Sequence, residues 1–397
     1  AEVLVRTAAG VVFGDGRSLD HSNNYDQFLS VIDGSSGKEI SRTPLPEDFK
    51  DDGPMGGHFG IAYLDGEYPS LIVKLENRKT DRTFNLLIAA YDYADRKLQL
   101  RWKWLRSDSV KAYDFHQIRI VDVNGDGKDD ICDGSYVINS DGKFLYAVEG
   151  AIHGDRFHIT DMDPGRPGLE GYAIQQTEGQ QTAAFPWYYY DAETGEIIFK
   201  GDILQDVGRG TVADINPDYK GYEMYSAGGV YAVDKTMLSS SMPVVNFKIW
   251  WDGDLLSELL DKTYIEKWNH TLKSSQKIFE APGVIYTARN APPFYGDVFG
   301  DWREEVMWET EDHKSIRIYT TTSLSDYKIY TLAQNPEYRA CLTTKGYYQS
   351  NLVNYYLGVG MSSEQPPEII YNNNRSCDSD ISPWKKINIV TSNDPNC

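Results

Sequence analysis

The sequence is poor in cysteine, histidine and long apolar segments, and each shortage excludes a class of protein. Its 397 residues include 4 cysteines and 7 histidines, with no CxxC or Cys/His metal spacing, so a structural zinc site is not expected. No apolar run approaches the roughly 20 residues that span a bilayer. There is no GxSxG, P-loop or HExxH motif either. Serine-triad hydrolysis, nucleotide transfer and zinc proteolysis therefore have no support in the sequence.

Basic residues are also scarce relative to acidic ones. Against 59 acidic side chains stand 39 lysines and arginines, which leaves a formal charge of −20. A surface this acidic repels phosphate backbones and anionic lipids. We therefore expect no nucleic-acid partner and no membrane-surface partner.

The cysteine pattern favours a secreted, extracellular protein. The number of cysteines is even, and Cys377 and Cys397 close a polar tail over residues 373–397, where we expect a disulfide. Sequons at Asn269 and Asn374 permit N-glycosylation. The chain opens directly at Ala1, so we expect that any leader has been removed. The alternative is an intracellular protein with four unpaired thiols.

A weak internal repeat organises residues 1–372. In each copy a short apolar strand leads into an acidic turn, and a second strand follows the turn. The copies occupy residues 61–73, 118–132, 157–172, 211–225 and 295–308. A second kind of hairpin, with a polar turn, lies between them at residues 29–34, 90–95 and 189–198.

Two hairpins per unit give four strands, which is typical of a β-propeller blade. A pair of stacked β-sheets would also have short strands, but it would not repeat the acidic turn at the same place in each unit. About six units are visible. The first residues read as the second half of an acidic-turn hairpin, so either another segment completes that blade or the chain is the later part of a longer protein. Helical periodicity is confined to residues 255–268, where we expect the only clear helix.

The sharpest local motif is the acidic turn at residues 122–130. Oxygen ligands recur at alternate positions, Gly127 permits the tight bend, and a further carboxylate follows. This spacing suits calcium, with the candidate ligands Asp122, Asn124, Asp126, Lys128 and Asp130. The alternative is a solvated Asp/Asn/Gly turn without metal.

Two looser turns repeat the pattern of early acids and a late glutamate. Their candidate ligands are Asp161, Asp163 and Glu170 in one turn, and Asp214, Asn216 and Glu223 in the other. Calcium at these turns would join blades rather than take part in a reaction. Because gathered carboxylates repel one another without a cation, calcium withdrawal should lower stability.

The candidate chemistry lies at the starts of inner strands, which converge on the axis of a propeller. His116, His153, His158 and, further off, His58 all stand at or just before acidic-turn hairpins, with Asp155 close by. A single histidine there is more often packing than function, whereas three in consecutive blades favour function. Arg209 lies between two glycines, which suits a carboxylate on a ligand, although a salt bridge with Asp206 is the alternative.

At these residues the chain resembles family 11 of the polysaccharide lyases, the rhamnogalacturonan lyases. The matching segments occur in the same order along most of the chain; they are residues 60–71, 122–129, 153–158, 163–170, 206–210, 249–256, 300–306, 317–322 and 346–347. The resemblance implies an eight-bladed propeller with bound calcium and a central cleft. It also implies cleavage of an acidic plant cell-wall polysaccharide, at rhamnose–galacturonate linkages, by β-elimination.

Four residues fall on positions that resemble the family's cleft residues: His116, His153, Arg209 and Tyr347. Arg289 falls where the family usually carries a lysine, because the family's Asn-Gly-Thr-Lys loop is here Tyr286-Thr287-Ala288-Arg289. We also expect substrate contacts from His58, Asp155 and His158.

The resemblance implies proton abstraction from C5 of a uronic acid and departure of the oxygen on C4. Arg209 and Arg289, or calcium, would neutralise the carboxylate, His116 or His153 would accept the proton, and Tyr347 would bind or transfer a proton. Two other readings stay open: a calcium-dependent carbohydrate-binding propeller without catalysis, and a lyase for another uronate polymer. We expect a monomer.

Overall fold

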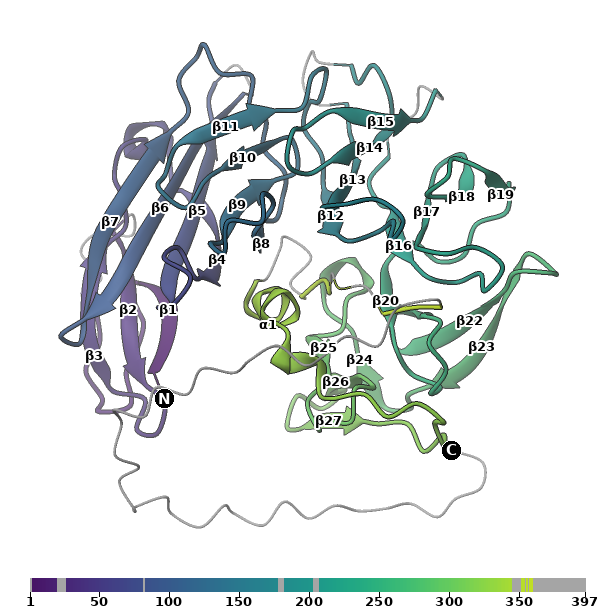
Figure 1. The fold of residues 1–397 in the computed structure, drawn as a ribbon. Helices are drawn as coiled ribbons and strands as arrows, with labels where there is room; N and C mark the ends of the chain where they lie inside the picture. Colours follow the sequence, from purple (N-terminus) through teal and green to yellow (C-terminus); the bar gives the residue numbers. More distant parts are fainter. Residues whose placement is uncertain are drawn as a thin grey trace.

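The computed structural model is an all-β protein in which seven sheets are arranged around a common centre (Figure 1). It describes residues 2–19, 26–80, 83–177, 182–202, 207–344, 351–353, 355 and 357–359. In six of the seven sheets, strands that pair are consecutive in the sequence. Sheets of consecutive antiparallel strands around a centre define a β-propeller, as the sequence predicts.

The first three sheets contain eleven strands. They are β1 (Glu2–Ala8), β2 (Gln27–Asp33) and β3 (Glu39–Pro44); β4 (Gly56–Ala62), β5 (Ser70–Arg78), β6 (Phe84–Ala94) and β7 (Lys97–Leu105); and β8 (Arg119–Val121), β9 (Asp130–Asp133), β10 (Tyr136–Ile138) and β11 (Phe144–Ala147). Within the described residues the first sheet has three strands and the other two have four.

The remaining four sheets have four strands each. They are β12 (Arg156–Thr160), β13 (Glu170–Ile174), β14 (Trp187–Asp191) and β15 (Ile197–Lys200); β16 (Thr211–Ala213), β17 (Glu223–Ser226), β18 (Gly229–Ala232) and β19 (Met237–Ser239); β20 (Phe247–Ile249), β21 (Glu258–Asp261), β22 (Tyr264–Asn269) and β23 (Ser274–Glu280); and β24 (Val284–Ile285), β25 (Phe294–Gly296), β26 (Glu305–Thr310) and β27 (Ile316–Tyr319). In the last sheet, β26 pairs with β24, β25 and β27.

Helical structure in the described residues is short. The 3-10 turns are η1 (Lys50–Asp52), η2 (Ala288–Asn290) and η3 (Leu332–Gln334), and the α-helix is α1 (Pro336–Thr343), which contacts β4 and β8 near the centre (Figure 1). Asn335 caps α1 by accepting a hydrogen bond from the Tyr338 amide at 3.2 Å. In this part of the chain, no helix is both long enough and apolar enough to cross a bilayer.

The five acidic-turn hairpins predicted from the repeat are all present. Four of them are the first two strands of a sheet, and the fifth is β25 and β26, which follow β24 in the last sheet. The expected helix over residues 255–268 is wrong. This stretch forms β21 and β22, which are joined by a turn at Lys262 with φ 53°. Glu258–Asp261 is buried between two partner strands, so tertiary burial overrides the helical spacing of its leucines. The mistaken helix hid one blade, so the prediction of about six units is corrected to seven among the described residues, which is one fewer than the eight blades that the resemblance implies.

The core is formed between neighbouring sheets. In β14, Tyr188 and Tyr190 pack with Val121 of the preceding sheet, whereas Trp187 and Tyr189 pack into a cluster with the following sheet. Successive side chains of a strand point to opposite faces, so a blade covered on both sides reads as a continuous apolar run. Burial on both faces therefore explains why a strand as short as β14 carries four consecutive aromatic residues.

The last described residues run along the inner strands of three blades. Asn351 Nδ2 donates to the Tyr295 carbonyl at 2.6 Å, and the Trp250 indole donates to the Leu357 carbonyl at 3.2 Å. The Val359 amide donates to Asp214 Oδ2 at 2.6 Å. The described residues of this segment therefore tie together the blades that contain β16, β20 and β25.

The structure describes two of the four cysteines. Cys132 and Cys341 are both buried. The predicted tail at residues 373–397, with Cys377, Cys397 and the sequon at Asn374, lies outside the described residues. Asn269 is exposed at the end of β22 and accepts a hydrogen bond from the Leu272 amide at 2.8 Å.

Candidate active site

The candidate residues gather at one end of the inner strands. His116 precedes β8, His153 precedes β12 and Arg209 precedes β16, while Arg289 lies in the turn before β25. β4, β8, β12, β16 and β20 contact one another in chain order. The acidic turns follow the same strands, so the candidate site and the acidic turns occupy opposite ends of the inner strands.

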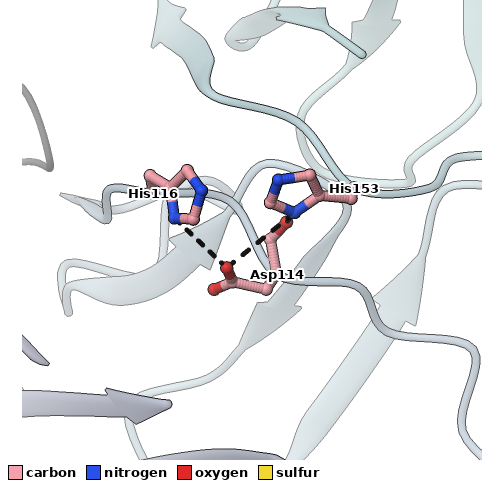
Figure 2. Close-up of side chains that lie close together, drawn as sticks. All are labelled: Asp114, His116 and His153. Atoms are coloured by element: carbon pink, nitrogen blue, oxygen red, sulfur yellow. Dashed lines mark hydrogen bonds and ion pairs between the residues drawn. The ribbon is translucent and has the colours of Figure 1, made fainter. Parts of the chain in front are cut away.

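Two histidines face a common carboxylate at the centre of this end (Figure 2). His116 Nδ1 lies 3.5 Å from Asp114 Oδ2, and His153 Nδ1 lies 3.9 Å from the same atom. The two ring centroids are 4.8 Å apart. His153 Nδ1 also lies 2.8 Å from the Asp114 carbonyl, a contact that requires the proton on Nδ1 and leaves Nε2 as the acceptor nitrogen. Phe84 stacks on the His153 ring and fixes its plane, with centroids 5.4 Å apart.

A group of buried charged side chains adjoins these two histidines. The fully buried Lys74 ammonium lies 2.5 Å from Asp114 Oδ1, 2.9 Å from Asp133 Oδ2 and 3.2 Å from Glu76 Oε2. It also donates to the Phe115 carbonyl. We call Lys74, Glu76, Asp114 and Asp133 the buried charge cluster.

The carboxyl groups of the cluster differ in the direction of their pKa shifts. Burial raises the pKa of Asp133 to about 6, and burial together with the Glu76 charge raises the pKa of Asp114 well above its usual value. Burial also acts to raise the pKa of Glu76, but the Lys74 ammonium, hydrogen bonds from Asp114 and His116 and the charge of His58 together outweigh it, so the pKa of Glu76 is lowered. One ammonium therefore faces one strongly ionised carboxylate and two carboxyls that retain protons more readily.

The predicted substrate contacts His58, Asp155 and His158 are placed differently. His58 Nε2 lies 3.9 Å from Glu76 Oε1, and Asp155 Oδ1 lies 3.8 Å from His116 Nε2, so both adjoin the His116 surroundings. His158 lies within β12, fully buried, with Nε2 3.5 Å from the Gly210 carbonyl. That position gives His158 a packing role beneath the site rather than a surface for a polysaccharide.

Arg209 and the Arg289 turn are joined through one asparagine. Arg209 Nη1 donates to Asn246 Oδ1 at 2.8 Å. Asn246 Nδ2 donates to the carbonyls of Arg289 and Asn290, each at 3.1 Å. Gly208, next to Arg209, is packed so closely that a Cβ there would lie 2.9 Å from the Gln176 amide nitrogen. Gln176 in turn donates to Asp155 Oδ2 at 3.1 Å, so the arginine and histidine parts of the site are contiguous.

Two of the sequence expectations at Arg209 and the last strand cannot be followed. Asp206, the alternative partner of Arg209, and Tyr347, the predicted binding or proton-transfer residue, lie outside the described residues. The site also contains residues that the sequence reasoning missed. Asp114 stands two residues before His116, Lys74 interrupts an apolar strand, and Asn246 precedes an inner strand as His153 and Arg209 do.

The turn at residues 122–130 has the compact geometry that its sequence predicts. Asp122 Oδ1 accepts from the Gly125 amide at 2.8 Å, and Asp122 Oδ2 accepts from the Gly127 amide at 2.8 Å. Asn124 Oδ1 accepts from the Asp126 amide at 3.0 Å, and Asp126 Oδ1 from the Lys128 amide at 2.9 Å. Gly127 has φ 82°, the left-handed conformation that glycine tolerates.

The last carboxylate of five acidic turns has a recurring role. Asp130, Glu170, Glu223 and Glu258 begin the second strand of a blade, Glu305 begins β26, and one oxygen of each accepts amide hydrogens from the turn. The second oxygen differs from blade to blade. In Asp130 and Glu223 it is buried without a hydrogen-bond partner, which is an observation that a cation would explain.

Two other turns already contain a cationic side chain. Arg166 Nε donates to Glu170 Oε1 at 3.1 Å, in the turn that also carries Asp161 and Asp163. Lys267 Nζ lies 3.0 Å from Glu258 Oε1 and 2.6 Å from Asp254 Oδ2. These two turns therefore have a positive charge beside the last glutamate, whereas the second oxygens of Asp130 and Glu223 lack a hydrogen-bond partner. Asp214 and Asn216 belong to the turn that ends in Glu223.

Comparison with known proteins identifies the family of this propeller. The family model described as "Rhamnogalacturonan lyase family 11, C-terminal domain" matches residues 1–367. The chain therefore belongs to this family, which confirms the resemblance seen in the sequence.

Individual relatives have both endo- and exo-acting names. The chain is 36% identical over 399 residues to the rhamnogalacturonan endolyase YesW of Bacillus subtilis (strain 168), covering 93% of this chain and 63% of that protein. It is 33% identical to the rhamnogalacturonan exolyase YesX of the same organism, covering 93% of this chain and 66% of that protein. The chain thus spans less than two thirds of the length of these curated relatives.

Solved structures agree with the fold. The crystal structure of rhamnogalacturonan lyase YesW superposes with a TM-score of 0.83 at 35% identity, covering 92% of this chain and 66% of that one. A Bacillus licheniformis rhamnogalacturonan lyase of family 11 superposes with a TM-score of 0.85 at 32% identity, covering 93% and 67%.

Proposed function

We propose that the chain forms the catalytic propeller of an enzyme that cleaves the rhamnogalacturonan backbone of pectin by β-elimination at a galacturonate residue. The observation that carries the proposal is the meeting of His116 and His153, with rings 4.8 Å apart, at the same end of the inner strands as Arg209. Imidazole and guanidinium groups together meet the two needs of the reaction, which are proton transfer and stabilisation of negative charge. The activities named for YesW and YesX are of this type.

The proposed reaction breaks the C5–H bond and the C4–O bond and forms a C4=C5 double bond. The proton on C5 is weakly acidic, because its removal builds a second negative charge beside the carboxylate. Arg209 and Arg289 neutralise the carboxylate and its developing charge. His116 or His153 accepts the C5 proton, and a protonated group delivers a proton to the departing oxygen, a role for which Tyr347 is the candidate.

Besides the group of Asp252, Asp254 and Glu258, which already contacts the Lys267 ammonium, two places in the described chain fit a divalent cation. Asp114, His116 and His153 each offer one ligand atom, and the three atoms lie within 4.8 Å of one another. The turn with Asp122, Asn124, Asp126, Lys128 and Asp130 offers oxygen ligands, including the unpartnered Asp130 Oδ1, which suits calcium. A cation at the first place would add positive charge near the substrate carboxylate, and calcium at the second would join strands. Thermal unfolding after chelation and after calcium is restored tests the second; an unchanged melting temperature contradicts it.

Elimination has a direct optical test. Incubation with rhamnogalacturonan, homogalacturonan and other uronate polymers should give new ultraviolet absorbance from an unsaturated uronate only with the rhamnogalacturonan. Arg209→Ala should lower kcat/KM by roughly 10²–10³-fold, since it removes a group that stabilises developing charge. The exposed Arg17, which pairs with Asp15 at 2.9 Å in the first part of the chain, supplies the matched control Arg17→Ala, which should retain activity. Near-normal turnover of Arg209→Ala removes that residue from the proposed site.

The second candidate function is a carbohydrate-binding propeller without catalysis. The Arg289 turn favours it, because Arg289 stands where the family usually carries a lysine. Binding of rhamnogalacturonan without new absorbance would support this candidate. New absorbance with a different uronate polymer alone would instead support a lyase of other specificity.

Secretion and a monomeric state belong to the same proposal. The substrate class is extracellular, and the chain carries a formal charge of −20, which disfavours self-association at low salt. Size-exclusion chromatography with light scattering tests the monomer; a particle of twice the mass of 45.0 kDa contradicts it.

A further inference from the structure

Asn246 lies at the junction of the two candidate arginines and is used by neither the family motifs nor the proposed chemistry. It is 1% exposed and directly precedes β20, the inner strand between the Arg209 blade and the Arg289 blade. Its side chain makes hydrogen bonds through both the oxygen and the nitrogen.

The side-chain oxygen of Asn246 receives two guanidinium groups. Arg209 Nη1 donates to it at 2.8 Å and Arg156 Nη2 at 3.1 Å. Arg156 is itself buried, donates to the Asn246 carbonyl through Nη1, and stacks its guanidinium 4.6 Å from the centre of the Phe247 ring. The oxygen is thereby held in a rigid setting, and the Arg209 guanidinium is bound to a fixed point.

The side-chain nitrogen of Asn246 holds the Arg289 turn. Nδ2 donates to Asp261 Oδ1 at 2.8 Å and to the carbonyls of Arg289 and Asn290 at 3.1 Å each. Arg289 and Asn290 have φ values of 65° and 64°, a left-handed conformation that costs free energy in residues with a Cβ. The Lys262 amide adds a bond to the Asn290 carbonyl at 2.9 Å. The hydrogen bonds from Asn246 and Lys262 therefore hold the turn in this conformation.

We propose that Asn246 is a positioning residue that sets Arg209 and Arg289 as one unit for recognising the uronate carboxylate. The inference rests on the proposed function and adds the residue that fixes the separation of its two cations. An amide is required, because the position needs an acceptor toward the guanidinium groups and a donor toward Asp261 and two carbonyls. A carboxylate supplies only the acceptor, and an alanine supplies neither.

The test compares Asn246→Asp, Asn246→Ala and Arg209→Ala with the unaltered chain. We measure kcat/KM and the affinity for a rhamnogalacturonan oligosaccharide, together with the affinity for the same oligosaccharide after reduction of its carboxyl groups. Both Asn246 variants should lose at least tenfold in kcat/KM, and their affinity should fall for the acidic ligand and not for the reduced one. Asn246→Asp should release the Arg289 turn by placing a carboxylate against Asp261. If Asn246→Ala does not fold, Asn246→Ser takes its place.

A double variant distinguishes positioning from a loss of stability. Asn246→Ala combined with Arg209→Ala should cost less than the sum of the two single losses, because the part of the Asn246 effect that acts through the Arg209 guanidinium is already lost, whereas the part that acts through the Arg289 turn remains. Thr7→Val is the control, since it breaks a buried hydrogen bond of 2.6 Å to Ser30 in the first sheet, and it should leave kcat/KM unchanged.

The possible outcomes separate the inference from the proposed function. Equal losses of affinity for the acidic and the reduced ligands, or additive losses in the double variant, overturn the positioning role. A sensitive Arg209→Ala with normal Asn246 variants overturns it as well and leaves the proposed function standing. If the unaltered chain neither cleaves nor binds the acidic oligosaccharide, both fail.

Discussion

Lys74 is the single cation of the buried charge cluster, and its replacement gives a sharp test of how the site is built. Lys74→Met keeps most of the side-chain volume and removes the ammonium that contacts Asp114, Asp133 and Glu76 at 2.5, 2.9 and 3.2 Å. Breaking a buried ion pair by removing one partner costs roughly 3–5 kcal/mol, because the other partner stays buried and uncompensated. Here three carboxyl groups are left together, so we expect the free energy of unfolding to fall by about this amount at neutral pH.

The loss should also depend on pH in one direction. Without the ammonium, the folded-state pKa values of all three carboxyls rise; those of Asp114 and Asp133 already lie above their unfolded values of about 4, and that of Glu76 loses the cation that keeps it low. A carboxyl whose folded pKa is raised loses stability as the pH increases from the unfolded value to the folded one. Lys74→Met should therefore be least harmful near pH 5 and most harmful near pH 8.

Urea unfolding followed by tryptophan fluorescence at both pH values measures this effect. Lys103→Met is the matched control, since its ammonium lies 2.6 Å from Asp48 at a partly exposed position. Such a pair contributes up to about 1 kcal/mol, with little change between the two pH values. A loss for Lys74→Met that is no larger than the loss for Lys103→Met, or that is equal at pH 5 and pH 8, would refute the reasoning.

Two further predictions concern charges away from the candidate site. Burial raises the pKa of Glu304 to about 7, so the free energy of unfolding of the unaltered chain should fall by about 3 kcal/mol between pH 4.5 and 7. Glu304→Gln cannot titrate and should not show this fall; equal pH profiles of the variant and the unaltered chain in urea would contradict this. Lys267→Met leaves Asp252, Asp254 and Glu258 without their shared ammonium, so its melting temperature should fall and then rise again with millimolar calcium. A melting temperature that ignores calcium would count against the cation-binding geometry of that turn.

Most of the fold follows from local patterns in the sequence. The acidic turn returns in several blades because a carboxylate at the start of the following strand accepts the amides of the turn, as Glu170 and Glu223 do. The missed blade shows the limit of such patterns. Leu255, Leu259 and Leu260 have helical spacing, but Glu258–Asp261 is buried between two strands, and a sequence alone does not display that burial.

The candidate site could be predicted only in part, for a related reason. His116, His153 and Arg209 are recognisable because each stands just before an inner strand. Lys74 and Asn246 act through partners 40 or more residues away, as the Phe115 and Arg156 contacts show, so only the assembled propeller reveals their role. His158 shows the reverse case: its place in the repeat predicts a substrate contact, but its side chain is fully buried in the structure.

The contacts of residues 351–359 carry a consequence for the order in which the chain assembles. They join partners separated by 58 residues at Tyr295, 107 at Trp250 and 145 at Asp214. Closing loops of this length costs conformational entropy before any contact can compensate it, so such contacts form late. During synthesis Val359 emerges after all the strands it helps to join, so we expect the blades to form first and the bonds between them along the inner strands to close last.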